Sequence, residues 1–280
     1  MTEHPAIAAD HVAVITGGAS GIGLAVAERL GSAGMRLLLA DIDEEQLRSA
    51  ADVLHAQGIA ADTLRVDVSD EAQVIDLKHA ADALGPVSLL MNNAGQEGGG
   101  GILAGAAVWQ RTIATNLMGA LYGVQHFLPD MIAANWPCTV VNTGSKQGVT
   151  LPPGDTAYNV SKAGLKALTE SLAHDLLATE GRISAHLLIP GFTYTGFSRR
   201  RGIVEKPPGA WTAEQVADFM LEGMARGDFY ILCPDNDVSR EMDERRIAWS
   251  AGDIIANRPA LSRWDPRFAA AFAAHMGEPK

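Results

Sequence analysis

Cysteine is scarce in this 280-residue chain, and long apolar runs are missing from it. The two cysteines, Cys138 and Cys233, are too few for a disulfide framework or a zinc cluster and suit a reducing compartment. No apolar run approaches the ~20 residues of a membrane-spanning helix. Residues 1–10 carry acids and lack the apolar segment of a secretory signal. We therefore expect a cytoplasmic protein that does not bind membranes.

Basic residues are also few, with 22 Lys and Arg against 33 Asp and Glu and a formal net charge of -11. Such a chain repels the phosphates of nucleic acids and anionic lipids, so we expect neither as a partner. His126, His174 and His186 follow no metal-ligand spacing, so we expect no metal. The hydrophobic share of 47% and the charged share of 20% are typical of a globular protein.

Short apolar segments alternate with longer segments of helical periodicity. Strands are predicted at 11–16, 36–40, 60–66, 87–91, 139–142, 184–189 and 229–233, and helices at about 22–33, 43–57, 70–84, 105–134, 155–179 and 212–226. Strands separated by such helices pair in parallel, and continuous apolar strands fit a sheet covered on both faces. We predict an α/β fold, a Rossmann-type doubly wound parallel sheet of about seven strands with helices on both faces.

No repeat or linker divides the chain, so we expect one catalytic domain over residues 1–280. Within it, residues 192–212 are rich in Gly, Pro and Arg, and residues 234–280 form a C-terminal extension. The extension carries too many apolar anchors for a free tail. These anchors are Trp249, Leu261, Trp264 and Phe268. We expect them to pack on the ligand pocket or on a neighbouring subunit.

A glycine-rich turn joins the first predicted strand to the first predicted helix. Thr16–Gly23 reads Gly-x3-Gly-x-Gly after the threonine. Glycines let the backbone approach a pyrophosphate, and a helix N-terminus offers free N–H groups. No Gly-Lys-Ser/Thr is present, which excludes a P-loop. By itself the turn fits a plain strand–helix connection equally well.

Asp41 favours the dinucleotide interpretation of that turn. It ends the second predicted strand, 18 residues after Gly23, close to the ~20 expected for a carboxylate on the adenosine ribose. A carboxylate there repels a 2′-phosphate, and neither Ala19 nor Ile42 is a compensating Arg or Lys. The prediction is NAD rather than NADP. The alternative is that Asp41 is a solvated strand end or a helix cap.

Tyr158 and Lys162 are four residues apart in a predicted helix and so share a face. A tyrosine titrates near ~10, too high for efficient proton transfer at neutral pH, and an ammonium one turn away lowers that pKa. Ser145 follows the fifth predicted strand, where the carboxyl ends of parallel strands open onto a ligand crevice. In isolation this spacing is common by chance.

The set of motifs, in one order, is much more specific than any member. It comprises Thr16-Gly17-x3-Gly21-x-Gly23, Asn92-Asn93-Ala94-Gly95, Asn116, Ser145, Tyr158-Asn159-Val160-Ser161-Lys162 and Pro190-Gly191. This set resembles the classical short-chain dehydrogenase/reductase family over about residues 12–233. The resemblance implies that Tyr158 is the general acid/base, that Lys162 lowers its pKa and holds the nicotinamide ribose, and that Ser145 polarises the carbonyl. It also implies that Asn116 holds a water linked to Lys162.

The resemblance further implies a set of cofactor contacts running from the pyrophosphate to the nicotinamide. The implied residues are Gly17, Ser20, Gly21, Ile22 and Gly23 at the pyrophosphate; Asp41, Ile42, Asp67 and Val68 at the adenosine; Asn93, Ala94 and Gly95 along its side; and Tyr158, Lys162, Pro190, Gly191, Thr193 and Thr195 at the nicotinamide.

Some segments depart from the family pattern. Lys146 follows Ser145 where small residues are usual; we expect it to point to solvent, the alternative being a place near the substrate entrance. Residues 96–101, with four consecutive glycines, predict a flexible loop that adapts to substrate or is a tolerant surface segment. Residues 192–212 stand where the family has a substrate lid. The aromatic residues of this segment predict a pocket wall: Phe192, Tyr194, Phe197 and Trp211. Its three arginines, Arg199–Arg201, either bind an acidic substrate or are solvated.

The sequence predicts an NAD-dependent oxidoreductase that interconverts a secondary alcohol and a ketone, with a bulky hydrophobic or aromatic substrate. We also expect a homodimer or homotetramer. One alternative is a non-catalytic dinucleotide-binding or redox-sensing protein, since a fold does not fix a function. Another keeps the cofactor and runs a dehydration or an epimerisation.

Overall fold

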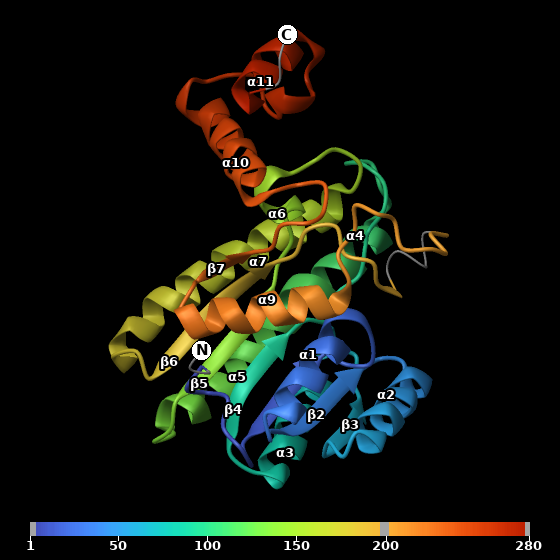
Figure 1. The fold of residues 1–280 in the computed structure, drawn as a ribbon, viewed down its shortest axis with the longest axis vertical. Coiled ribbons are helices and arrows are strands. Elements are labelled where there is room, and N and C mark those ends of the chain that lie inside the picture. The colour runs from blue at the N-terminus through green and yellow to red at the C-terminus, as the bar shows by residue number, and fades with distance from the viewer. Residues whose placement is uncertain (1–3, 197–201, 278–280) are drawn as a thin grey trace.

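The computed structural model describes residues 4–196 and 202–277. A seven-stranded sheet, parallel in every pairing, has the order β3-β2-β1-β4-β5-β6-β7 (Figure 1). Its strands are β1 (Val12–Thr16), β2 (Arg36–Asp41), β3 (Ala61–Arg65), β4 (Val87–Asn92), β5 (Cys138–Thr143), β6 (Ile183–Ile189) and β7 (Tyr230–Leu232). Chain order reverses between β1 and β4, and this is the place where doubly wound sheets bind ligands. The predicted fold class is confirmed.

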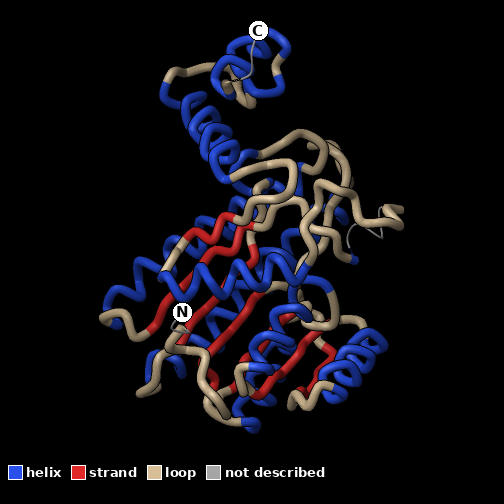
Figure 2. The backbone as a smooth tube through the Cα atoms, viewed as in Figure 1, coloured by secondary structure: helices blue, strands red, loops and turns tan. Residues whose placement is uncertain are grey.

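Helices cover both faces of the sheet (Figure 2). On one face lie α1 (Gly21–Ser32), α2 (Glu44–Ala56) and α9 (Ala213–Arg226), and on the other α3 (Glu71–Leu84), α5 (Gly119–Ala133) and α7 (Thr156–Asp175). Val14 and Ile15 are neighbours in β1, yet they pack into opposite cores because side chains alternate along a strand. Both are fully buried.

The predicted helix at 105–134 is interrupted by a π-helical turn. α4 (Ala106–Ile113) leads into a π segment (Ala114–Met118), and α5 follows directly. Single π turns inside helices are common at functional sites. This turn contains the buried Asn116. The predicted helix at 155–179 is α7 followed by a 3₁₀ turn (Leu176–Thr179), and Asp155 caps it by accepting from the Tyr158 N–H at 3.2 Å.

The C-terminal extension stands away from the sheet (Figure 1). It contains α10 (Arg240–Ile255), two 3₁₀ turns (Ser262–Trp264 and Pro266–Phe268) and α11 (Ala269–Met276). Trp249 is buried within the extension, with its ring centroid 5.3 Å from that of Phe272 and its indole N–H donating to Ser262 at 2.8 Å. Trp249, Leu261, Trp264 and Phe268 do not line the pocket described below, so the expected packing on the pocket is wrong.

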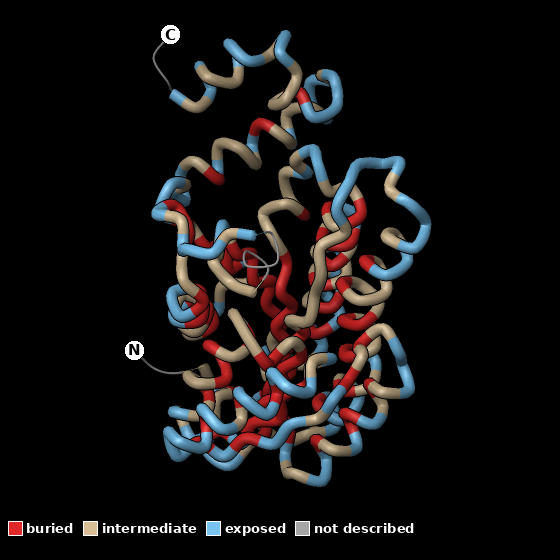
Figure 3. Tube along the Cα trace, turned by 90° about the vertical axis from the view of Figure 1, so that its right-hand side faces the viewer, coloured by how far each residue is buried: buried red, intermediate tan, exposed pale blue. Residues whose placement is uncertain are grey.

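Burial is concentrated in the layers around the sheet, while most of the extension is exposed or half-buried (Figure 3). No helix among the described residues has both the length and the apolar character needed to span a bilayer.

Candidate active site

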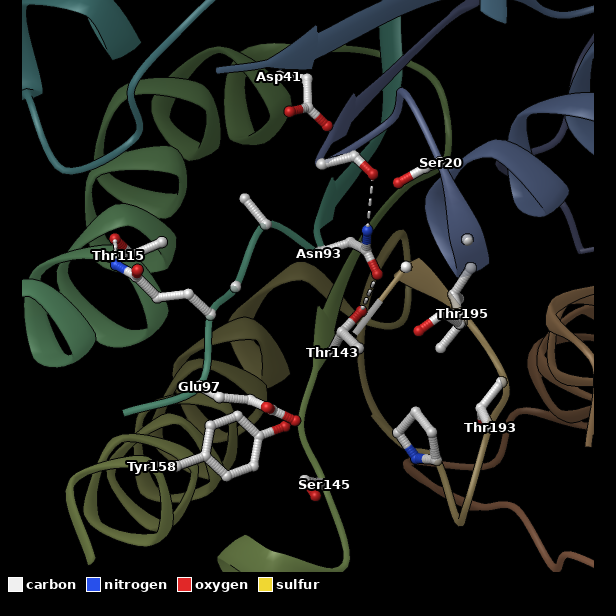
Figure 4. A pocket seen from close by; sticks show the side chains of 18 of the residues that line it. Ser20, Asp41, Asn93, Glu97, Thr115, Thr143, Ser145, Tyr158, Thr193 and Thr195 are labelled. Carbon is white, nitrogen blue, oxygen red and sulfur yellow. Dashed lines mark hydrogen bonds between the residues drawn. The ribbon is translucent and has the colours of Figure 1, made fainter. Parts of the chain in front are cut away.

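A cavity of about 620 Å³ opens at the carboxyl ends of the strands. Every site residue predicted from the sequence lines it except Gly23 and Asn116. Figure 4 shows Asp41 and Ser20 towards one end and Tyr158 and Ser145 towards the other. The sequence reasoning did not assign the following lining residues to the site: Ala40, Asp43, Gln46, Val66, Thr115, Thr143, Gly144, Gly196 and Ile203. Most of these adjoin predicted site residues in the chain, but Gln46 does not, and Ile203 belongs only to the segment at 192–212.

The glycine turn is built to bring backbone close to a ligand. Gly17 and Gly21 have positive φ angles of 64° and 56°. A Cβ on Gly17 would lie 2.9 Å from the Ala94 Cα, so the turn packs directly against the end of β4. The Asn93 amide locks this contact by donating to the Thr16 and Gly17 carbonyls at 3.1 and 3.2 Å. A Cβ on Gly23 would lie 2.3 Å from the Gly17 carbonyl oxygen, so Gly23 supports the turn from behind.

The N-terminus of α1 points its amides toward this turn. Its N-cap, Ser20, makes no side-chain capping hydrogen bond and lines the cavity. The first N–H groups of a helix and the positive end of its dipole favour an anion such as a pyrophosphate.

Asp41 is held at the end of β2 by two backbone donors. Its carboxylate accepts from the Ala19 N–H at 3.3 Å and from the Asp43 N–H at 3.2 Å. Asp67, after β3, accepts from both the backbone and the hydroxyl of Ser69, at 2.9 and 2.6 Å. Both carboxylates line the cavity, so this end of it is acidic.

Tyr158 and Lys162 share one face of α7, as predicted. The Lys162 ammonium lies 5.8 Å from the centroid of the Tyr158 ring and donates to the Thr143 carbonyl at 2.7 Å. Lys162 is 4% exposed, and desolvation by burial lowers its pKa from 10.5 to about 8. The ammonium form therefore still dominates at neutral pH, where its charge favours the phenolate of a nearby tyrosine.

Ser145 follows β5 and lies beside Tyr158 at the same end of the cavity (Figure 4). Its Oγ accepts from the Gln147 N–H at 3.1 Å, at the start of the short helix α6 (Gln147–Thr150). That hydrogen bond fixes the oxygen and leaves the hydroxyl proton available to a substrate oxygen.

Asn116 is buried behind the cavity and anchors the loop after β4. Its Oδ1 accepts from the Gln96 N–H, and its Nδ2 donates to the Gln96 carbonyl, both at 2.8 Å. Nδ2 also donates to Ser161 in α7 at 3.0 Å. The side chain thus joins the loop, the π turn and α7; the water predicted beside it stays a prediction.

The loop at residues 96–101 is hydrogen-bonded at several points, and its expected flexibility stays a prediction. The Gln96 side chain donates to Thr115 at 2.7 Å, and the Gly98 N–H donates to Asp155 at 3.0 Å. The Gly100 carbonyl accepts from the Thr156 N–H at 3.2 Å. Because these partners belong to the π turn and to α7, the loop is set by the same helices that carry the site.

Lys146 does not point to solvent, so that expectation is wrong. Its ammonium lies 3.2 Å from an Asp235 carboxylate oxygen and 2.6 Å from one of Asp243, and all three side chains are largely buried. Asp235 also accepts from the Phe192 N–H at 3.1 Å. A Cβ on Gly191 would lie 2.6 Å from this carboxylate. The ion pairs therefore join the loop after β5 to the segment after β7 and to α10, and the hydrogen bond from Phe192 adds the segment after β6.

Of the predicted aromatic wall, Phe192 lines the cavity, while Tyr194 and Trp211 do not. Backbone hydrogen bonds of 2.8 Å pair Trp211 with Phe192 and Tyr194, and the Trp211 ring packs on Phe219 instead. Phe197 and Arg199–Arg201 lie outside the described residues. In residues 4–196 and 202–277, no three His, Cys, Asp or Glu side chains are grouped so as to hold a metal ion.

Comparison with known proteins agrees with this geometry. A family model described as short chain dehydrogenase matches residues 11–204. The chain belongs to the short chain dehydrogenase family. A relative in this family, the 3beta-hydroxysteroid dehydrogenase 2 of Eggerthella lenta, is 32% identical over 69% of this chain and 74% of its own.

Two solved structures show the family fold with different cofactors. A short chain dehydrogenase/reductase from Burkholderia phymatum in complex with NAD is 35% identical, with a TM-score of 0.82 over 92% of this chain and 97% of its own. A variant of the actinorhodin polyketide ketoreductase with NADPH is 28% identical, with a TM-score of 0.69 over 78% of this chain and 91% of its own. The chain is thus an enzyme of the short chain dehydrogenase family, whose members use a nicotinamide dinucleotide.

Proposed function

We propose that this protein is an NAD-dependent oxidoreductase that interconverts a secondary alcohol and a ketone. The observation that carries the proposal is the cavity itself, which runs from the Asp41 carboxylate past the glycine turn to Ser145 and Tyr158. The turn at Gly17 has no room for a Cβ, and the N-terminus of α1 opens onto the cavity, so the residues present fit a dinucleotide.

The preference for NAD rests on charge at the adenosine end. Asp41 and Asp67 line that end, whereas the two lysines among the described lining residues, Lys146 and Lys162, are bound to other acceptors. A 2′-phosphate there would meet carboxylates without a compensating cation. One solved relative is a complex with NAD and the other a complex with NADPH, so the proposal of NAD rests on Asp41.

Three side chains carry the proposed proton transfer. The bound cofactor supplies or accepts the hydride. Tyr158 gives a proton to the carbonyl oxygen during reduction and takes it back from the alcohol during oxidation. Lys162 holds positive charge beside the phenol, which lowers the free energy of the phenolate. Ser145 donates to the same substrate oxygen and orients it.

The substrate end of the cavity favours a bulky hydrophobic or aromatic compound. Phe192 and Ile203 line the cavity, and they belong to the segment at 192–212 that we propose as a substrate lid. A relative named as a hydroxysteroid dehydrogenase is in line with a large apolar substrate. We further propose one domain over residues 1–280, with the extension at 234–280 attached to it.

A non-catalytic dinucleotide binder explains the structure less well. Burying the Lys162 ammonium is costly, and a protein that only binds a dinucleotide has no need of an acid/base pair formed by this lysine and a phenol. Dehydration and epimerisation stay open as alternative reactions of the same site with the same cofactor.

The test is NADH absorbance with a panel of secondary alcohols and ketones, each assayed with NAD and with NADP. The proposal expects turnover of at least one aromatic or alicyclic alcohol, with a higher kcat/KM for NAD. Dinucleotide binding by the folded protein without turnover across the panel would contradict it. We also propose a cytoplasmic location and a homodimer or homotetramer. The mass of the native particle tests the number of subunits.

A further inference from the structure

Gln147 lines the cavity just after Ser145, and its side-chain amide has no hydrogen-bond partner in the described part of the chain. The other amide side chains at the cavity, those of Gln46, Asn93 and Gln96, donate to oxygens of the protein at 2.6, 3.1 and 2.7 Å. Gln147 is half-buried, yet neither its amide oxygen nor its amide nitrogen is closed off from solvent. The amide is therefore a donor and an acceptor that a ligand in the cavity can reach.

The backbone of Gln147 is held in place by Ser145 and by α7. Its N–H donates to the Ser145 Oγ at 3.1 Å, and its carbonyl accepts from the Leu151 N–H at 3.1 Å. The next residue, Gly148, is buried, and a Cβ on it would lie 2.6 Å from the backbone carbonyl carbon of Lys162. A glycine at this position lets α6 pack directly on α7. The Gln147 side chain thus starts from a fixed point before any ligand binds.

This starting point is close to the place of the reacting oxygen in the proposed chemistry. Because the Gln147 nitrogen is 3.1 Å from the Ser145 Oγ, the Gln147 Cα lies no more than about 4.6 Å from that oxygen. A substrate oxygen that accepts from Ser145 lies about 2.5–3.0 Å from the same Oγ. The amide of Gln147 therefore serves the part of the substrate next to the reacting carbon rather than a remote end of it.

The ligand group that suits the Gln147 amide is neutral. An amide carries no charge that would offset the loss of hydration of an ion. The cations among the described lining residues are Lys146 and Lys162, and both already donate to oxygens of the protein. A hydroxyl or a carbonyl oxygen pairs with the amide through an ordinary hydrogen bond and leaves no charge unpaired.

We propose that Gln147 is a specificity-determining residue whose amide binds a second neutral oxygen, on a carbon bonded to the carbinol carbon. The substrates are then vicinal diols and α-hydroxy ketones rather than simple secondary alcohols. Oxidation of such a diol passes a hydride to NAD and a proton to Tyr158 and leaves an α-hydroxy ketone. The inference rests on the proposed function, because it takes Ser145 and Tyr158 as the groups that meet the reacting oxygen.

Two aryl carbinols of nearly equal shape and matching configuration test the preference. Styrene glycol carries a hydroxyl on the carbon next to the carbinol carbon, and ethyl phenyl carbinol carries a methyl group in the same place. A site that places a polar group for a substrate hydroxyl discriminates against the analogue that lacks the hydroxyl, because the polar group is then left unpaired. With the wild-type protein and NAD, kcat/KM is expected to be higher for styrene glycol.

Variants assign that preference to the Gln147 side chain. In Gln147→Leu, kcat/KM for styrene glycol should fall by about 5- to 30-fold, as for the loss of a buried hydrogen bond, while that for ethyl phenyl carbinol holds or rises. In Gln147→Glu, a carboxylate stands where the amide was and pairs with an ammonium. The kcat/KM for phenylethanolamine, which carries an ammonium in place of the second hydroxyl, should therefore rise by about fivefold or more.

The design separates recognition from damage to the site. Both variants keep the backbone N–H that donates to Ser145, and each comparison is made between two substrates of one protein. Gln57→Leu is the matched control, because Gln57 is exposed at the end of α2 and does not line the cavity. It should leave the ratio of the two kcat/KM values unchanged.

Three results would each overturn the inference: a wild-type protein that oxidises ethyl phenyl carbinol at least as well as styrene glycol, an equal fall for both alcohols in Gln147→Leu, or no gain on phenylethanolamine in Gln147→Glu. An equal fall would make Gln147 a structural residue of α6. Failure of the proposed function looks different, because the folded wild-type protein would then oxidise none of these alcohols, or any of the wider panel, with NAD or NADP.

Discussion

Lys162 donates to the carbonyl of Thr143 at 2.7 Å and thereby ties α7 to the last residue of β5. The same ammonium lies beside the Tyr158 ring, and burial lowers its pKa to about 8. The fold thus keeps a charged group in its interior, at a cost in stability, next to the phenol that we propose as acid and base.

Replacing Lys162 should abolish activity without lowering the free energy of unfolding at pH 7. Lowering its pKa from 10.5 to about 8 corresponds to a penalty of about 3 kcal/mol for carrying the buried charge below pH 8. The penalty fades between pH 8 and 10.5, where the folded state has lost a proton that the unfolded state keeps. Lys162→Met should therefore be at least as stable as the wild type at pH 7, with its advantage shrinking toward pH 10, and should lose oxidoreductase activity.

Urea unfolding of both proteins between pH 6 and 10 measures this difference. Lys166→Met, one turn further along α7, is the matched control, because Lys166 forms a partly exposed pair with Glu170 worth little to stability. A Lys162→Met protein that is less stable than the wild type at pH 7 and gains on it as the pH rises would contradict the argument.

Asp41 should control the choice between NAD and NADP. Asp41→Asn keeps an acceptor for the Ala19 N–H but removes the negative charge, so it measures the contribution of that charge to the preference for NAD over NADP. We expect the ratio of kcat/KM for NAD to that for NADP to fall by about tenfold or more. Steady-state kinetics with each cofactor checks this, and a wild-type enzyme that already prefers NADP would show that Asp41 lacks this role.

Lys146 should hold the C-terminal extension to the site. Lys146→Met leaves the buried carboxylate of Asp235 without its cation and that of Asp243 with only Arg246, 4.0 Å away. Breaking such a buried pair typically costs about 3–5 kcal/mol. We expect a lower Tm and faster proteolytic cleavage ahead of α10. The triple variant Lys146→Met, Asp235→Asn, Asp243→Asn should recover part of the loss. Unchanged cleavage in Lys146→Met would mean that other contacts hold α10 in place.

Much of the fold was predictable because its signals are local. Most strands are short apolar runs that are buried on both faces, with the edge strand β3 as an exception. The covering helices carry apolar stripes, so the period of the pattern indicates the type of element. Among the cavity residues, the glycines, Asp41 and Ser145 were predictable from their places at strand ends, while most of the other cofactor contacts were implied only by the family resemblance. The π turn was not predictable, because shifting one turn of helix leaves no trace in the spacing of apolar residues.

The remaining differences come from partners far apart in the chain. Lys146 was expected in solvent because Asp235 and Asp243 cannot be assigned to it by spacing. The hydrogen bonds from the loop at 96–101 to Asn116 and Asp155 could not be assigned by spacing either, because these partners come later in the sequence.

The most direct test compares binding and turnover in Tyr158→Phe. This change removes the phenol oxygen alone, so NADH binding, followed by fluorescence titration, should stay within about threefold of the wild type. Hydride transfer in a single turnover with a good ketone should fall by about 100-fold or more, as expected for the loss of a general acid. A Tyr158→Phe enzyme that binds NADH and reduces the ketone at the wild-type rate would contradict the proposed chemistry.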